Sequence, residues 1–457
     1  MVAPARQAAF DILRSVNAGA RDLPAALSAS RDGLREPRDQ ALVTELATGT
    51  LRWRGAIDHL IAHYARRPVA RLDPSVLDTL RLGTYQLVYL DRIPARAAIY
   101  DAVEIARAGG ARSAAGLVNA VLRAIDRERQ RLPWPPDPGA AGPPARQLDY
   151  LSVTRSHPRW LVERWRDREG YDAAKAWTTF NNQPAPLTLR VNTLVTTAAA
   201  LAADFAAEGI AVETARYAPD GLVVREGNPL TSPLAGSGRF LAQDETSQLV
   251  AVLANARPGE RVLDTCAAPG GKTSAMAAAM RDDGLIAAVD HRAPRVDLLR
   301  RHIASSRAQA VRIVRADARR PLPFGVGFDL VLLDAPCSGL GTIRREPEIR
   351  WRREPADLAV FADTQRGLLE HAAVVVARGG RLLYATCSGE PEEDDEVVDR
   401  FLADHREFRA ADPDVVARAL PAQAVAVLDP DGRLRTRPWR HGLEAFFAAM
   451  LVKRKHL

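Results

Sequence analysis

Cysteine is scarce in this chain: its 457 residues include only Cys266, Cys337 and Cys387. The three lie far apart in the sequence, and none belongs to a CxxC pair or to a cluster of cysteine with histidine. This spacing excludes a disulfide scaffold and disfavours a zinc site, so we expect no metal. Unpaired thiols suit a reducing compartment, and the expected location is cytoplasmic.

Lysine and long apolar runs are also rare. Lysine occurs only at positions 175, 272, 453 and 455, so arginine carries almost all of the positive charge. No apolar run reaches the roughly 18 residues that a membrane helix requires. The first residues, MVAPARQAAFDILRSV, contain Asp11 and Arg14 where a signal peptide would be apolar throughout. We therefore expect neither a membrane span nor a membrane partner.

The chain has a modest excess of positive charge, with 63 Lys and Arg against 56 Asp and Glu and a formal net charge of +7. Such an excess is compatible with a polyanionic partner but does not establish one. The length exceeds what a single hydrophobic core usually serves, which predicts two or three domains.

Residues 1–131 are predicted to form an all-α domain. Apolar residues recur there at three- and four-residue spacing in Ala8–Val16, Arg38–Thr50, Ile57–Ala65, Val76–Tyr89, Ala97–Ala108 and Ala115–Glu128. Asp73 and Pro74 are suited to start the fourth of these helices, and Gly109 and Gly110 to end the fifth. Residues 132–149 follow as an extended linker, because six prolines between positions 133 and 144 disfavour helix and central strand.

From residue 150 the pattern mixes strands with helices. Residues 150–239 are predicted to form a small α+β domain, with strands in LTLRVNT and at Leu222–Val224 and a helix at Thr197–Gly209. Residues 240–457 alternate strands with helices, which predicts a mostly parallel, doubly wound sheet. The expected strands are Arg261–Asp264, Leu285–Val289, Val311–Val314, Phe328–Leu333, Arg381–Tyr384 and Phe446–Val452.

A glycine turn follows the first strand of the third region. Residues 266–272 read CAAPGGK and lead into a helix. The glycines let the backbone approach a ligand closely, and the first turn of the helix offers free N–H groups to it. Asp264, Asp290, Asp317 and Asp334 follow or end successive strands. Asp290 is placed to bind ribose hydroxyls, and Asp317 to reach an adenine amino group. The pattern therefore predicts a nucleotide-type cofactor site.

Two cofactors compete for this turn. GGKT is typical of the phosphate-binding loop of NTPases, but that motif requires glycine at position 266, where this chain has cysteine. Four carboxylates at successive strand ends would also repel a triphosphate, whereas they suit the sulfonium cation of S-adenosylmethionine. The pattern favours S-adenosylmethionine, and the alternative is a nucleotide-hydrolysing enzyme.

Cys337 and Cys387 lie in DAPCSG and YATCS, directly after two expected strands. Both thiols are therefore expected at strand ends, where α/β folds keep their chemistry. An unperturbed thiol is only a few per cent ionised at neutral pH, so a nearby positive charge is needed. The candidates for that charge are Lys272, Arg344, Arg345 and Arg350.

A thiol beside a methyl donor suggests covalent catalysis on cytosine. C5 of cytosine is a poor nucleophile, but attack by a thiolate at C6 makes C5 enamine-like, so that it takes a methyl group. Asp334 is placed to stabilise the protonated N3 of the base. Spacing alone does not decide which thiol attacks, because DNA cytosine methyltransferases use the cysteine of a PC motif, as at Cys337.

DTCAAPGGKT, DAPCSG and YATCS, in this order, resemble the motifs of the NOL1/NOP2/Sun family of RNA cytosine-5 methyltransferases. RFLAQDETSQLV before the first strand and GTIRREPEIRW after Cys337 resemble the same family. The resemblance runs from about Ser156 to the C-terminus. It implies a Rossmann-like methyltransferase sheet whose last strand, Phe446–Val452, is antiparallel.

The resemblance also implies roles for individual residues. Cys387, in the TCS motif, is the implied nucleophile, and Cys337 is the implied helper of product release. Asp334 has an implied part both in catalysis and in holding the donor. The residues implied to hold S-adenosylmethionine are Cys266, Ala267, Ala268, Pro269, Gly270, Gly271, Lys272, Asp290, Asp317 and Asp334.

The helical region resembles NusB-like RNA-binding domains in ARQAAFDILRSV, GTLRWRGAIDHLI, LRLGTYQLVYLDRIP and LVNAVLRAI. The expected architecture is multidomain: an all-α NusB-like domain, a small α+β RNA-binding domain and an α/β Rossmann-like class I methyltransferase domain. It implies a bacterial enzyme, expected to be a monomer, that methylates C5 of a cytosine in small-subunit (16S) rRNA. An unstacked base in free or early-assembly RNA is the natural substrate. An RNA-dependent NTPase and a non-enzymatic RNA-binding factor are the alternatives.

Overall fold

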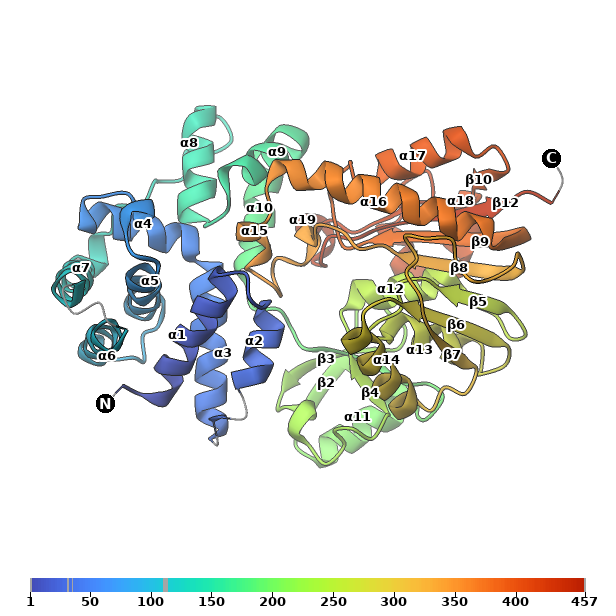
Figure 1. The fold of residues 1–457 in the computed structure, drawn as a ribbon, viewed down its shortest axis with the longest axis horizontal. Coiled ribbons are helices and arrows are strands. Elements are labelled where there is room, and N and C mark those ends of the chain that lie inside the picture. Colours follow the sequence, from blue (N-terminus) through green and yellow to red (C-terminus); the bar gives the residue numbers. More distant parts are fainter. Residues whose placement is uncertain (1, 31–32, 35, 110–113, 456–457) are drawn as a thin grey trace. The chain divides into compact units, whose positions relative to one another are not determined.

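A computed structural model describes residues 2–455, except 31–32, 35 and 110–113. The chain forms two compact units (Figure 1). Unit 1 comprises Met1–Pro184 and Ile343–Pro355, and unit 2 comprises Ala185–Thr342 and Ala356–Leu457. The short segment Ile343–Pro355 therefore belongs to unit 1, although unit 2 flanks it in the sequence.

Unit 1 consists of helices, and its largest apolar core contains fully buried leucines such as Leu13, Leu46 and Leu122. The six helices expected in residues 1–131 are confirmed as α1 and α3–α7. Helix α2 was not expected, because it is short and buries only Leu23 and Ala26. The α-helices are α1 (Pro4–Asn17), α2 (Leu23–Ser30), α3 (Pro37–Arg52), α4 (Arg54–Ala65), α5 (Pro74–Tyr89), α6 (Ala95–Ala108), α7 (Ala115–Arg127), α8 (Pro144–Asp149), α9 (Arg159–Glu169), α10 (Tyr171–Asn182) and α15 (Ile349–Arg352).

Helix ends in unit 1 follow the sequence signals, with one correction. The carboxylate of Asp73 accepts hydrogen bonds from the backbone N–H groups of Ser75 (2.8 Å) and Val76 (3.2 Å), as expected for the start of α5. Gly109 caps the end of α6, and Gly110 lies outside the described residues. The expectation of no helix before residue 149 is wrong, because α8 begins at Pro144. Proline is tolerated there since the first helical N–H needs no partner within the helix.

Unit 2 begins with a small antiparallel sheet. Its strands are β1 (Thr188–Val191), β2 (Ala211–Thr214), β3 (Gly221–Glu226) and β4 (Phe240–Ala242), in the order β2-β3-β1-β4. Helix α11 (Ala198–Ala207) packs Leu201 and Phe205 into the same small core as Leu189. Strands β1 and β3 were expected. Strand β2 was not, because it is mostly exposed and lacks an alternating apolar pattern.

The larger sheet of unit 2 has the order β10-β12-β9-β8-β5-β6-β7, and β11 pairs with β12. Neighbours from β9 to β7 run parallel, and β12 runs antiparallel to β9, which confirms the expected last strand. The six expected strands are all present. The strands are β5 (Arg261–Asp264), β6 (Leu285–Asp290), β7 (Val311–Arg315), β8 (Phe328–Asp334), β9 (Val376–Thr386), β10 (Phe408–Ala410), β11 (Leu434–Arg435) and β12 (Phe447–Lys453).

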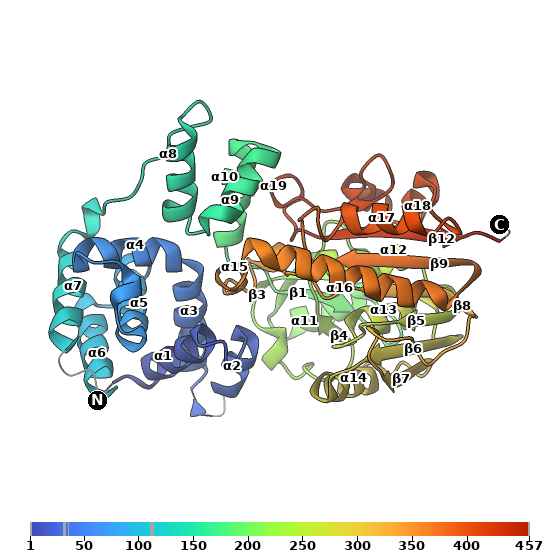
Figure 2. The same ribbon diagram turned by 45° about the horizontal axis from the view of Figure 1, so that its top comes forward.

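Helices cover both faces of this sheet, which confirms the doubly wound fold (Figure 2). Alternate residues of β8 show the two faces: Leu330 and Leu332 join one core, whereas Val331 and Leu333 join the other. The first core includes α12 (Glu245–Ala254), α13 (Gly271–Ala279), α14 (Ala293–Ser306) and α18 (Pro413–Ala419), and the second includes α16 (Pro355–Val374) and α17 (Asp395–Asp404). The remaining helix, α19 (Pro438–His441), is one short turn.

The strand order places a switch point between β5 and β8. From β5 the chain continues to β6 and β7 on one side, and it then returns to β8 and β9 on the other. Open α/β sheets bind ligands at the carboxyl ends of the strands beside such a point. The expected site residues come from the loops at this edge.

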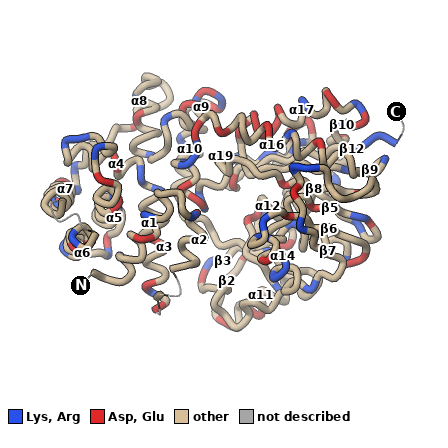
Figure 3. The backbone as a smooth tube through the Cα atoms, viewed as in Figure 1, with Lys and Arg blue, Asp and Glu red and all other residues tan. Residues whose placement is uncertain are grey.

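Charged residues of both signs are interspersed along the chain in both units (Figure 3). The net charge of +7 is therefore not confined to one element. Of the helices in the described part of the chain, none is long and apolar enough to cross a bilayer.

Candidate active site

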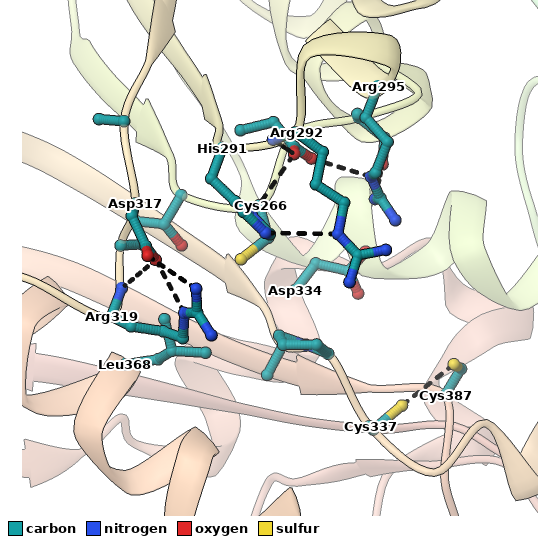
Figure 4. Close-up of a pocket in the computed structure, with 17 residues that line it drawn as sticks. Cys266, His291, Arg292, Arg295, Asp317, Arg319, Asp334, Cys337, Leu368 and Cys387 are labelled. Carbon is teal, nitrogen blue, oxygen red and sulfur yellow. Dashed lines mark hydrogen bonds and ion pairs between the residues drawn. The ribbon is translucent and has the colours of Figure 1, made fainter.

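Four acids meet at the carboxyl edge of the large sheet. Asp264, Asp290 and Asp334 are the last residues of β5, β6 and β8, and Asp317 follows β7. A cavity of about 300 Å³ opens at this edge (Figure 4). Three of the acids and all three cysteines line it, namely Asp290, Asp317, Asp334, Cys266, Cys337 and Cys387.

The glycine turn fits closely between β5 and α13. Gly270 has a φ of +106°, a backbone conformation that residues with a side chain rarely adopt. A Cβ atom at Gly270 would also lie 2.8 Å from Leu299 and from His302 of α14. The backbone N–H of Ala267 donates to the carbonyl of Val289 at 2.8 Å, which ties the turn to β6. Glycine at position 270 thus lets the loop turn directly into the helix.

The residues expected to hold the donor fall on two adjoining cavities. Cys266 and Ala268 line the cavity of about 300 Å³ and also a neighbouring one of about 190 Å³. The second cavity is also lined by Ala267, Pro269, Gly271 and Lys272, together with Asp264 and Asp334. Gly270 lines neither cavity and acts through the shape of the turn.

Arginines that were not predicted pair with two of the acids. Asp290 accepts hydrogen bonds from the Arg295 side chain (3.1 Å) and from the backbone N–H of Arg292 (3.2 Å). Arg319 binds Asp317 at 2.8 Å, and this hydrogen bond lowers the pKa of Asp317 to about 2. Each arginine follows its acid by a few positions, in DHRAPR or in DARR. This short spacing is the feature of the sequence from which the two pairs could have been predicted. Both pairs line the larger cavity.

Asp264 is in a different environment from the other acids. Burial raises the pKa of Asp264 to about 7. Its Oδ2 accepts a hydrogen bond from the hydroxyl of Thr273 at 2.7 Å, whereas its buried Oδ1 has no hydrogen-bond partner within the described structure. A buried acceptor without a partner is costly unless a ligand supplies a donor. Asp264 was not among the predicted donor-binding residues.

Lys272 brings positive charge to this edge. Its ammonium lies 2.6 Å from the carboxylate of Asp334. Burial is the largest single influence and disfavours the ammonium, but Asp334 and the other nearby acidic groups together raise the pKa of Lys272 above its usual value. Interaction with the thiolate form of Cys387 acts in the same direction. Lys272 is therefore a cation that is paired with Asp334 and interacts electrostatically with Cys387.

Two of the arginines proposed beside Cys337 donate hydrogen bonds to oxygen atoms of unit 1. The buried guanidinium of Arg350 donates to Ser156 O (3.0 Å) and to Asn182 Oδ1 (2.9 Å) inside unit 1. Arg344 donates to Pro184 O at 2.6 Å, also within unit 1. Sequence reasoning assigned both to Cys337 because they follow it closely along the chain. The segment Ile343–Pro355 belongs to unit 1, as do these acceptors, and the assignment to Cys337 stays a prediction.

The two thiols of the DAPCSG and TCS segments lie side by side. The Sγ atoms of Cys337 and Cys387 are 3.2 Å apart, within hydrogen-bond distance for sulfur (Figure 4). The hydrogen bond with Cys387, followed by burial, raises the pKa of Cys337 well above its usual value. The raised pKa favours the protonated form of Cys337, and either sulfur atom can be the donor in this contact.

Backbone contacts hold the two cysteine segments together. The N–H of Gly341 donates to the carbonyl of Cys387 at 3.0 Å, and the N–H of Ala445 donates to the carbonyl of Gly341 at 3.2 Å. A Cβ atom at Gly341 would lie 1.8 Å from the carbonyl oxygen of Ala445. A residue without a side chain is thus required where the segments meet.

Comparison with known proteins agrees with this geometry. A family described as 16S rRNA methyltransferase RsmB/F matches residues 251–452, the NusB family matches residues 3–127, and the ferredoxin-like domain of RsmF/B-like methyltransferases matches residues 157–231. The matches confirm the three kinds of domain expected from the sequence.

Individual relatives are similar along most of their length. A probable ribosomal RNA small subunit methyltransferase B of Bacillus subtilis is 36% identical, with 91% of each chain covered. Ribosomal RNA small subunit methyltransferase B of Pseudomonas putida is 36% identical, with 98% of each chain covered. The crystal structure of the protein PH0851 is similar with a TM-score of 0.80 and 27% identity, and the match covers 99% of each chain.

These similarities favour a methyltransferase over a nucleotide-hydrolysing enzyme. They agree with the resemblance inferred from the cysteine motifs and the glycine turn. The chain belongs to the RsmB/F family of 16S rRNA methyltransferases, and its methyl donor is S-adenosylmethionine.

Proposed function

We propose that this protein methylates C5 of a cytosine in small-subunit rRNA through a transient bond between Cys387 Sγ and C6 of the base. The proposal rests on one observation above all. The two sulfur atoms lie 3.2 Å apart in the same cavity as Asp290, Asp317 and Asp334. A nucleophile, a second thiol and the acids for a donor are thereby gathered at the switch point of one sheet.

The residues at this edge fit S-adenosylmethionine. In the proposal, Asp290 binds the ribose hydroxyls and Asp317 binds the adenine amino group, and the glycine turn from Cys266 to Lys272 borders the rest of the site. Asp264, whose Oδ1 has no hydrogen-bond partner within the described structure, also lines the adjoining cavity. When bound, S-adenosylmethionine supplies an electrophilic methyl group.

Cys387 is the proposed nucleophile. The ammonium of Lys272 attracts a thiolate at this position, because the two groups interact electrostatically. The thiolate adds its electron pair to C6 of the cytosine and makes C5 nucleophilic. After transfer, a general base takes the C5 proton, the electrons of that C–H bond restore the C5–C6 double bond, and the carbon–sulfur bond breaks to release Cys387 as a thiolate.

Cys337 and Asp334 have supporting roles in the proposal. Cys337 shares a hydrogen bond with the sulfur of Cys387, and its raised pKa favours its protonated form. That proton is available when Cys387 leaves the product, which fits a role in release. Asp334 stabilises the protonated N3 of the cytosine during attack, while its hydrogen bond with Lys272 keeps its carboxylate in place.

The substrate is proposed to be free or early-assembly rRNA. A cytosine inside a duplex presents neither C5 nor C6 to a thiol, so the base must be unstacked. The NusB-like helices supply contacts to the phosphates, and binding is expected to weaken as salt rises.

The assignment of the two thiols is tested by one substitution at each. Cys387→Ser should bind donor and RNA but transfer no methyl group, because a hydroxyl is a far weaker nucleophile. Cys337→Ala should accumulate the bond between Cys387 and RNA. The measurements are methyl transfer to unmodified small-subunit RNA and a shifted protein band on a denaturing gel.

Cys266→Ala is the matched control, because this third thiol lines the same cavity but takes no part in the proposed bond. It should not accumulate an adduct, and any loss of methyl transfer should come only from weaker donor binding. Near-normal turnover by Cys387→Ser would overturn the assignment of the nucleophile. If Cys387→Ser accumulates an adduct and Cys337→Ala forms none, Cys337 is the nucleophile and Cys387 assists product release.

A further inference from the structure

One buried carboxylate joins the two cysteine segments. Ser338 and Ser388 directly follow Cys337 and Cys387, and both hydroxyls donate to Oε2 of Glu393, at 2.5 Å and 2.7 Å. The other oxygen, Oε1, accepts the backbone N–H of Ser338 at 2.7 Å. Glu393 therefore contacts the residue after each thiol.

Glu393 is itself held rigidly. Its Oε1 also accepts the side-chain amide of Gln365 on α16 at 3.1 Å, and its carbonyl accepts the hydroxyl of Tyr384 on β9 at 2.6 Å. Glu393, Gln365, Ser338 and Ser388 all have no exposed surface. The carboxylate is thus fixed by the sheet and by a helix on one of its faces, and the cysteine segments are fixed to the carboxylate.

The chemistry of the position favours an acid. The four donors just described are neutral, and a carboxylate is costly to bury among neutral groups. Yet a carboxylate offers about four acceptor sites on two oxygens and no competing donor. It is the side chain that accepts all four hydrogen bonds at once. The free energy that burial of the Glu393 carboxylate costs is therefore offset only by the connection that it makes between the two cysteine segments.

We propose that Glu393 is a positioning residue that sets the separation of Cys337 and Cys387. This inference rests on the proposed function, in which the two thiols act on the same base. Without the carboxylate, the segments after β8 and β9 lose their shared support, and the sulfur atoms move apart. A displacement of about 1 Å in a reacting group is enough to cost roughly a hundredfold in rate.

The test measures the distance between the thiols independently of activity. Diamide oxidises two neighbouring thiols to a disulfide and is itself reduced to the hydrazine, so the rate of formation of a Cys337–Cys387 disulfide reports their proximity. Mass spectrometry of peptides after alkylation follows this rate. Glu393→Ala should slow it by about tenfold or more and should slow single-turnover methyl transfer similarly. Affinity for S-adenosylmethionine should stay unchanged.

Two further variants separate positioning from stability. Glu393→Gln keeps one acceptor oxygen for the Ser338 N–H and Gln365, and its amide N–H groups can donate to the two serine hydroxyls. It should restore most of the disulfide rate. The double variant Ser338→Ala with Ser388→Ala keeps Glu393 but removes its hydroxyl contacts. It should behave like Glu393→Ala, and it replaces that variant as the test if Glu393→Ala fails to fold.

Glu260→Gln is the matched control. Glu260 binds Arg381 on β9 at 2.5 Å, so its loss removes an ion pair from the same strand but not from the cysteine segments. The disulfide rate should not change. Wild-type disulfide and transfer rates in Glu393→Ala, or in the serine double variant, would overturn the inference. A wrong choice of nucleophile would leave the disulfide result intact, so the two proposals fail separately.

Discussion

Asp264 and Asp317 show how the pKa of the same side chain shifts in opposite directions at two strand ends of one sheet. Asp264 is buried beneath the glycine turn, and burial raises the pKa of its carboxyl to about 7. Asp317 lies near the surface beside Arg319, whose hydrogen bond lowers the pKa of Asp317 to about 2. At neutral pH the edge therefore combines a firmly ionised acid with one that is partly protonated.

The raised pKa of Asp264 predicts a loss of stability with rising pH. An unfolded chain releases this proton near the ordinary pKa of 3.8, whereas the folded chain keeps it to about 7. Between these values the folded state binds more protons, so the free energy of unfolding falls as pH rises. Asp334 adds to this effect, and Lys272 opposes it. Asp264→Asn should remove this decrease in the free energy of unfolding.

Denaturant unfolding of donor-free protein at pH 5 and pH 8 checks this prediction. The wild type should lose more stability between the two pH values than Asp264→Asn does. Asp317→Asn is the control, because the pKa of Asp317 lies below this range. An equal loss in the wild type and in Asp264→Asn would show that Asp264 does not titrate in this window.

At the scale of elements, the short 3-10 helix Leu340–Thr342 joins the segment after β8 to the segment after β9. Gly341 lies there between the carbonyls of Cys387 and Ala445, and a Cβ atom would meet the latter at 1.8 Å. The strand ends alone thus do not bring the thiols together. Their approach also requires close backbone packing.

Gly341→Ala should separate the cysteine segments. The clash is with backbone, which cannot move aside as a flexible side chain would, so adduct formation and methyl transfer should fall by about tenfold or more. Donor affinity should be less affected, because the glycine turn is a different loop. Gly367→Ala is the matched control. Nothing lies within 4 Å of its Cβ position on α16, and alanine should stabilise that helix by about 1 kcal/mol. Normal transfer by Gly341→Ala would contradict the prediction.

At the scale of the whole molecule, the chain leaves unit 2 directly after this 3-10 helix and enters unit 1 for Ile343–Pro355. Three contacts anchor that segment. Arg350 binds Ser156 O, the indole of Trp351 donates to Leu51 O at 2.7 Å, and Glu348 accepts the N–H of Leu23 at 2.9 Å. The segment therefore links the helical unit to the residues that follow Cys337.

This path predicts that a cut between Pro184 and Ala185 will not release unit 1. A protease site inserted there should give two fragments that remain together in size-exclusion chromatography, because Ile343–Pro355 stays folded in unit 1. Arg350→Met keeps the length of the side chain but removes its buried hydrogen bonds, which should cost about 3 kcal/mol and promote separation. Wild-type fragments that separate without denaturant would contradict the prediction.

Much of the fold was predictable because its signals are local. Helix periodicity identified α1 and α3–α7, and apolar runs identified the five parallel strands and β12. The acids, the glycine turn and the two cysteines of the site were found because each directly follows a strand. Strand β2 and helix α2 were missed, because both bury too few residues to show a period.

The sequence by itself identified the candidate groups of the site: two thiols, four strand-end acids and a glycine turn, each specified by the few residues around it. Tertiary structure alone decided how they are paired. Segments distant in the chain set the 3.2 Å distance between the two sulfur atoms and the hydrogen bonds of Glu393 with both serines. They also decide that Arg350 belongs to unit 1. Local sequence sets backbone conformation and polarity, whereas distances between segments arise only when the whole sheet and its helices pack.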